Sequence, residues 1–122
     1  MLFCYVSMEE DKARVLIENA QEYYRNGVGA HRRKEYNSAV TLFFKTISAL
    51  CDLYIYSKEG RIPSSHADRF RILESNYKDI YNIIDRTFPF YQNSYRDKLN
   101  EEVSTTLKND VEKLFKILNI RI

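Results

Sequence analysis

The sequence predicts an all-α protein: an antiparallel, up-and-down bundle of four long helices with one short helix. Apolar side chains recur every three or four residues in several long stretches, which is the spacing of a helix with one buried face. Only three Gly and two Pro occur in 122 residues, whereas sheet-rich folds use these residues at many tight turns. The sequence also lacks a convincing β-hairpin pattern.

Length and composition predict one folded domain, residues 1–122, with residues 1–7 as a loosely ordered N-terminal segment. A chain of this length buries roughly two-thirds of its unfolded surface, so it needs no disulfide or metal in order to fold. Its hydrophobic content of 44% and charged content of 30% are close to those of ordinary globular proteins. We therefore expect a packed core and little disorder.

Charge and cysteine usage exclude several classes of protein. The net charge of +2, from 19 basic and 17 acidic side chains, predicts neither a strong polyanion binder nor an acidic tail. Cys4 and Cys51 are far apart and no His pair has metal-ligand spacing, so we expect no metal site, and Cys51 to be a small core residue. We also expect no cofactor, because no Gly-rich phosphate loop or nucleophile elbow is present.

The sequence predicts a cytoplasmic protein without a membrane segment. Its first residues lack the basic and apolar regions of a secretory signal. No run of about 18 apolar residues occurs that would span a bilayer.

Two helices are predicted in the first half of the chain. The first covers about residues 8–25 and ends at residues 26–29, where two Gly tolerate the left-handed conformation that ends helices. The second covers about residues 34–56 and is apolar around most of its circumference, with charge almost confined to Lys45 and Asp52. Such a helix is either central to a bundle or shared between a core and an interface. On this ground we expect a homodimer.

The second half predicts three more helices. Residues 65–68 (SHAD) fit a capping box and begin a helix that continues to about residue 86. Residues 87–89 (TFP) interrupt it, because Pro disfavours a helical residue before it. The last helix is expected at about residues 102–118. Between them, a shorter helix would carry the apolar side chains of Phe88, Tyr91, Tyr95 and Leu99.

Several segments occur in an order that resembles the HEPN domain family. Residues 35–39 (EYNSA) precede a lysine-bearing apolar helix, residues 43–50 (FFKTISAL). Residues 62–66 (IPSSH) resemble the family's Pro-x-x-His start of the third helix. Residues 91–96 (YQNSYR) resemble its aromatic and arginine segment before the last helix. The resemblance extends over roughly residues 13–118.

The resemblance implies a helical bundle that commonly dimerises and is often partnered with a minimal nucleotidyltransferase. Some family members are metal-independent ribonucleases with an Arg followed four to six residues later by His, late in the bundle. Here the late segment contains Arg86 and Arg96 but no His, because the two His of the chain are His31 and His66. We therefore expect a binding module rather than an enzyme, with a nucleotide, RNA or a partner protein as its ligand.

Five residues are the candidates for contact with a nucleotide or RNA. Helix N-termini attract anions, and aromatic side chains near Arg can stack bases. The opposing interpretation is that the aromatic residues pack in the core and that the basic residues, including the run at residues 31–34, are solvated. The candidates are Arg61, His66, Arg69, Tyr95 and Arg96.

The sequence leaves two other functions open. In a ribonuclease toxin, His66 would move a proton while Arg61 stabilises charge on the phosphate. This spacing crosses a loop that contains Pro63, and an exposed Arg followed by a His in the first turn of a helix is the favoured explanation. A helical scaffold similar to tetratricopeptide proteins would show a repeat of about 34 residues, which the chain lacks.

Overall fold

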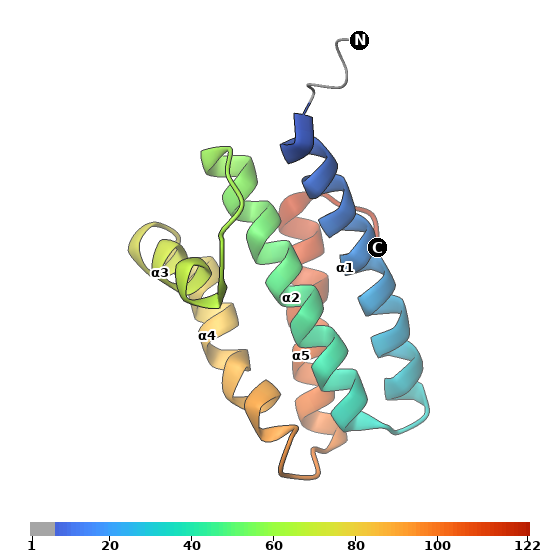
Figure 1. Cartoon of the computed structure of the whole chain (residues 1–122). Helices are drawn as coiled ribbons and strands as arrows, with labels where there is room; N and C mark the ends of the chain where they lie inside the picture. Colours follow the sequence, from blue (N-terminus) through green and yellow to red (C-terminus); the bar gives the residue numbers. More distant parts are fainter. Residues whose placement is uncertain (1–6) are drawn as a thin grey trace.

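The computed structural model describes residues 7–122, and this part of the chain contains five helices and no strand. The all-α prediction is confirmed, and the short helix is the third. Residues 1–6 lie outside the described part, and with them Cys4 and most of the segment expected to be loosely ordered. The helices are α1 (Ser7–Arg32), α2 (Tyr36–Glu59), α3 (His66–Asn76), α4 (Lys78–Asn93) and α5 (Glu101–Leu118) (Figure 1).

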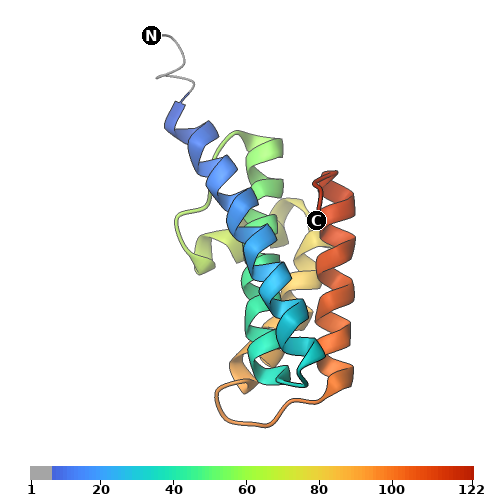
Figure 2. The same ribbon diagram turned by 90° about the vertical axis from the view of Figure 1, so that its right-hand side faces the viewer.

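α2 lies at the centre of the bundle and contacts each of the other four helices. In Figure 1, α1 and α4 lie on opposite sides of α2, and α5 lies behind it. α3 is displaced to the side and packs mainly against α4. Figure 2 shows that α1 crosses α2 at an angle and that the α1–α2 and α4–α5 connections lie at the same end of the bundle. The four long helices therefore run alternately up and down.

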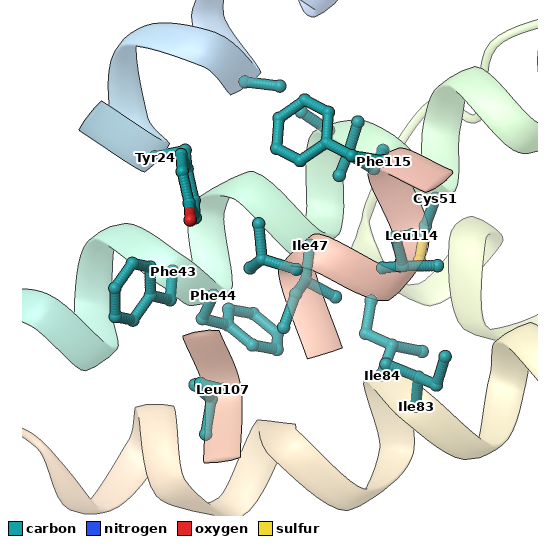
Figure 3. Close-up of a cluster of buried hydrophobic side chains, with 14 of the residues drawn as sticks. Tyr24, Phe43, Phe44, Ile47, Cys51, Ile83, Ile84, Leu107, Leu114 and Phe115 are labelled. Carbon is teal, nitrogen blue, oxygen red and sulfur yellow. The ribbon is translucent and has the colours of Figure 1, made fainter. Parts of the chain in front are cut away.

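The core forms where α1, α2, α4 and α5 face one another (Figure 3). Tyr24 of α1 packs edge-on against Phe115 of α5, with ring centroids 5.7 Å apart, and lies 6.0 Å from the ring of Phe43. Cys51 is fully buried in the same cluster, as predicted. Burial raises the pKa of its thiol, so Cys51 is an inert packing residue.

Aromatic rings join α4 to α2. The ring of Tyr91 stacks on Phe44 with centroids 4.6 Å apart, and Phe88 lies 5.7 Å from the same ring. The sequence favours core packing for five aromatic residues that recur along this part of the chain, and this is confirmed for all of them except Tyr95, which is 73% exposed. The members that pack against the core are Tyr77, Tyr81, Phe88 and Tyr91.

The apolar surface of α2 is covered by other helices of the same chain. Thirteen of its 24 residues are buried, because neighbouring helices cover it on several sides. The dimer predicted from this apolarity therefore loses that support and stays a prediction. The expectation that no segment could span a bilayer is wrong as a statement of length and composition, because α2 meets both conditions. Most of α2 is buried within the described part of the chain, and the core helix of a soluble protein meets the same conditions.

The predicted end of the first helix at residues 26–29 is wrong, because α1 continues to Arg32. Gly27 is buried where α1 crosses α2, and a Cβ atom at this position would lie 2.6 Å from Cε1 of Phe43. A residue without a side chain is needed for this close approach. The chain instead leaves the helix at Lys34, which takes a positive φ of 62°.

The predicted helix over residues 65–86 is also wrong, because it is divided at Tyr77 into α3 and α4. The Tyr77 hydroxyl donates to Glu59 Oε2 at 2.9 Å, and its ring packs on Tyr54 with centroids 5.4 Å apart. Pro89, the expected interruption, lies inside α4. A Pro inside a helix costs about 3 kcal/mol, and the rings that flank it, packed on α2, offset this cost.

The remaining helix ends follow local chemistry. Ser65 caps α3 as predicted, since its hydroxyl accepts from Asp68 N at 3.1 Å. α2 continues three residues beyond its expected end and stops where Gly60 takes the left-handed conformation, with φ 74°. α5 lies within one residue of its predicted bounds. The predicted helix carrying Tyr95 and Leu99 does not form, because both residues lie in the α4–α5 connection.

Two glycines of α1 provide a matched test of the packing at the α1–α2 crossing. In Gly27→Ala the new methyl group meets the buried Phe43 ring, so we expect the free energy of unfolding to fall by about 1–2 kcal/mol. In Gly29→Ala the nearest atom is Nη1 of the mobile Arg33 side chain at 3.2 Å. That variant should be neutral or gain up to about 1 kcal/mol from helix propensity. Urea unfolding monitored by circular dichroism measures both, and equal stabilities would contradict the explanation.

Candidate functional site

A buried ion pair joins the centre of α2 to α3. The Arg69 guanidinium donates from Nε to Asp52 Oδ1 at 2.6 Å and from Nη2 to Oδ2 at 3.0 Å. The two side chains are only 11% and 9% exposed. A buried carboxylate is costly unless a partner of opposite charge satisfies its oxygens, and a two-pronged Arg contact does so with a defined geometry. The pair therefore fixes the Arg69 guanidinium in one orientation.

Arg69 in turn holds the ring of His66, the first residue of α3. Its third donor, Nη1, lies 2.6 Å from His66 Nδ1. A guanidinium can only donate hydrogen bonds, so Nδ1 must be the accepting, unprotonated nitrogen. In the neutral ring the proton is therefore on Nε2. The order Asp52–Arg69–His66 is a relay of hydrogen bonds from the core to an exposed imidazole.

The surroundings of His66 favour its neutral form. Partial burial and the positive charges of Arg69 and Lys45 hold the pKa of His66 below its ordinary value of 6.5, although the Asp52 carboxylate acts in the opposite direction. At neutral pH the ring is thus uncharged, with an N–H group on its outer nitrogen. It can donate one hydrogen bond to a ligand.

A polar stripe on α2 leads to this relay. Lys45, Ser48 and Asp52 are spaced three and four residues apart, which places them on one face of the helix. Lys45 is exposed. The Ser48 hydroxyl is buried, and no other described residue provides it with a hydrogen-bond partner. An unsatisfied buried hydroxyl is unusual, and this one lies on the face that also carries Asp52.

Arg61 is already engaged by acidic side chains. Its Nε lies 3.2 Å from Glu59 Oε1, and its Nη1 lies 3.9 Å from Asp68 Oδ2. The Asp68 carboxylate also accepts from the backbone N–H of Ser64 at 3.0 Å and from Arg71. Little positive charge is therefore left at Arg61 to attract a phosphate.

Tyr95 and Arg96 lie apart from this relay. Both line a hollow of about 480 Å³ in the α4–α5 connection, and the hydroxyls of Tyr91 and Tyr95 lie 3.0 Å apart. Asn37, in the first turn of α2, holds this connection through bonds to Ser94 O, Asp97 O and Leu99 N at 2.7–2.9 Å. From Asn37 to Asp52 is 15 residues of helix, or about 22 Å. The structure thus brings His66 and Arg69 together and leaves Tyr95 and Arg96 at the end of the bundle.

The basic run at residues 31–34 ends α1 at that same end of the bundle. His31 Nδ1 lies 2.8 Å from Ser104 Oγ of α5, and Arg33 pairs with Glu35 at 2.9 Å. Both contacts are ordinary structural ones. Within residues 7–122, no group of three or more His, Cys, Asp or Glu side chains is placed to hold a metal ion.

Sequence reasoning missed the role of Asp52. It noted the residue as one of the few charges on an apolar helix, without assigning it a partner. An acidic residue surrounded by core positions implies a buried cation nearby, which is a usable signal. The signal does not say which of the many Arg supplies that cation, because the answer depends on where the 60–65 loop places α3.

Comparison with known proteins assigns this chain to no family. No protein family matches it, and neither does any curated protein or solved structure with which it was compared. The resemblance to HEPN domains therefore stays a hypothesis from the sequence. What the chain does has to be inferred from its own side chains.

A double-mutant cycle tests the coupling of Asp52 and Arg69. Asp52→Leu or Arg69→Met alone leaves a buried charge without its partner, and we expect each to lower the free energy of unfolding by about 3–5 kcal/mol. The double variant should recover much of this loss, because neither charge remains. The control is the Arg86–Asp110 pair, where Arg86 is 51% exposed and the coupling should be about 1 kcal/mol or less. Additive losses at Asp52 and Arg69 would contradict the relay.

Proposed function

We propose that this chain is a non-catalytic, HEPN-like helical binding module that binds a nucleotide or RNA at the surface around His66. The observation that supports this function most directly is the hydrogen bond from Arg69 to His66 Nδ1. It makes the exposed edge of the imidazole a donor of hydrogen bonds. A donor held in a fixed orientation by a buried ion pair is suited to binding.

The same hydrogen bond makes His66 a poor proton-transfer catalyst. A general base needs a free lone pair on the nitrogen that faces the substrate, but the proton of the neutral ring lies there. A general acid needs the imidazolium form, which would direct a second N–H group at the Arg69 guanidinium. The depressed pKa of His66 agrees with this repulsion.

A ribonuclease that uses Arg61 and His66 is less well supported. Arg61 would have to leave the carboxylates of Glu59 and Asp68 in order to stabilise a phosphate in the transition state. His66 would have to break its bond with Arg69 to act as a base. Each rearrangement breaks a stabilising contact, so each would raise the free energy needed to reach the transition state.

The proposal also includes dimerisation and pairing with a minimal nucleotidyltransferase. Both now rest on the resemblance to HEPN domains, because the apolar face of α2 is covered within the protomer.

Incubation with labelled single-stranded RNA, without metal, tests the choice between binding and cleavage. We expect intact RNA with the wild-type protein, and bound RNA that His66→Ala weakens because the outer N–H donor is lost. Arg96→Gln serves as the control for the distant hollow at the α4–α5 connection. Cleavage that disappears in His66→Ala would overturn the proposal in favour of the ribonuclease.

Size-exclusion chromatography with light scattering tests the dimer. We expect twice the mass of one chain at micromolar concentration. A mass of one chain across the whole concentration range would remove the dimer from the proposal. The binding function of His66 would then belong to the monomer.

A further inference from the structure

The exposed edge of His66 is an unused donor. Nδ1 is occupied by Arg69, and no described residue in the range 7–122 bonds to Nε2. The Nε2–H group is available to a ligand because the His66 residue is exposed at the surface. The group that it contacts must therefore accept a hydrogen bond.

Lys45 adds a positive charge on the face of α2 that carries Asp52. It lies seven residues, or two helical turns, before Asp52 on the same face of α2. Its positive charge is one of the causes that lower the pKa of His66. Lys45 is exposed, and none of the ion pairs among the described residues includes it. It is therefore free to bind an anion from solution.

The balance of charges around His66 favours an anion. On the α2 side, Lys45 and Asp52 carry opposite charges, and on α3 Arg69 adds a second cation. The other acid in the first turn of α3, Asp68, is already bound by Arg61, Arg71 and the Ser64 backbone. One positive charge therefore remains uncompensated beside the Nε2–H donor. A phosphate group has both the acceptor oxygens and the charge that this pair of groups can bind.

We propose that His66 Nε2–H and the Lys45 ammonium group together bind a phosphate group, with Arg69 and Asp52 as positioning residues that hold the imidazole as a donor. This rests on the proposed nucleotide or RNA binding and names the residues that contact its phosphate. Asp52 and Arg69 do not touch the ligand, since all their polar atoms face each other or His66 Nδ1. The Ser48 hydroxyl, unpaired among the described residues on the same face, adds unused hydrogen-bonding capacity next to the relay.

The tautomer of His66 is the first measurement, and it needs no ligand. Long-range ¹H–¹⁵N NMR of the labelled protein at pH 7.5 should show the proton on Nε2 and a bare Nδ1. A proton on Nδ1 would overturn the relay, because that nitrogen could not accept from Arg69. The second His of the chain, His31, serves as an internal reference in the same spectrum.

Titration with inorganic phosphate is the second measurement, read from the backbone amide resonances at the start of α3 in every variant and also from the ring resonances where His66 is present. We expect saturable shifts, with binding weakened roughly tenfold in Lys45→Gln and lost in His66→Ala. His66→Gln should retain part of the affinity, since its amide N–H₂ can reach the position of Nε2–H. The substituted side chains are exposed, so the variants should keep the wild-type melting temperature.

Two control titrations test whether the ligand is phosphate and whether it binds at His66. Acetate should bind more weakly than phosphate, and equal affinity would overturn the assignment to phosphate. Arg96→Gln should leave phosphate binding unchanged, because Arg96 lies at the end of the bundle in a separate hollow. Loss of binding in Arg96→Gln, with Lys45→Gln unaffected, would move the anion to that hollow and overturn the proposal.

The same variants separate this inference from the proposed function. If His66→Ala weakens RNA binding but Lys45→Gln does not, the phosphate contact of Lys45 is wrong while binding at His66 stands. If neither variant weakens RNA binding, both the phosphate contacts and the binding site at His66 are wrong. If phosphate binds at His66 but neither RNA nor a nucleoside triphosphate does, the anion site stands and the nucleotide function is wrong.

Discussion

Asp52 is a charged residue in the most apolar helix of the protein, and its burial requires a cation at hydrogen-bond distance. Arg69 provides that cation from α3, a helix that otherwise packs mainly on α4. The requirement therefore affects two helices: it orients α3 against the centre of the bundle, and it leaves Nη1 as the one donor nitrogen of Arg69 that is not bonded to Asp52. That donor determines which nitrogen of His66 carries the proton. A constraint in the core thus sets the chemistry of a group at the surface.

The position of α3 also depends on the helices around it. Tyr77 divides α3 from α4 and ties the break to the end of α2 through Glu59 and Tyr54. α4 is held against α2 by the stacking of Tyr91 on Phe44. These contacts keep the N-terminus of α3 beside the polar face of α2, so the relay is supported by packing on both sides. Groups supported in this way lose little freedom when a ligand binds.

Local patterns predicted some features of the chain well and others poorly. The caps at Ser65 and the burial of Cys51 could be predicted because each depends on the residue type and its near neighbours. The misplaced helix ends have a common cause. Gly27 and Pro89 favour a break when taken alone, but the packing of Phe43 against α1 and of the aromatic rings beside Pro89 outweighs that preference. Tyr77, which carries no breaking signal, is where the chain bends.

The sequence by itself determined the fold class, the apolar character of α2 and the presence of His66 and Arg69 in one helical turn. Helical periodicity and a three-residue spacing are local properties, so they can be read along the chain. Only the tertiary structure decided that Arg69 points to Asp52, that Arg61 is bound by acids, and that Tyr95 and Arg96 lie at the far end of the bundle. Those outcomes depend on which helix faces cover α2. Packing decides this through the sum of many contacts between residues far apart in sequence, and no local pattern encodes that sum.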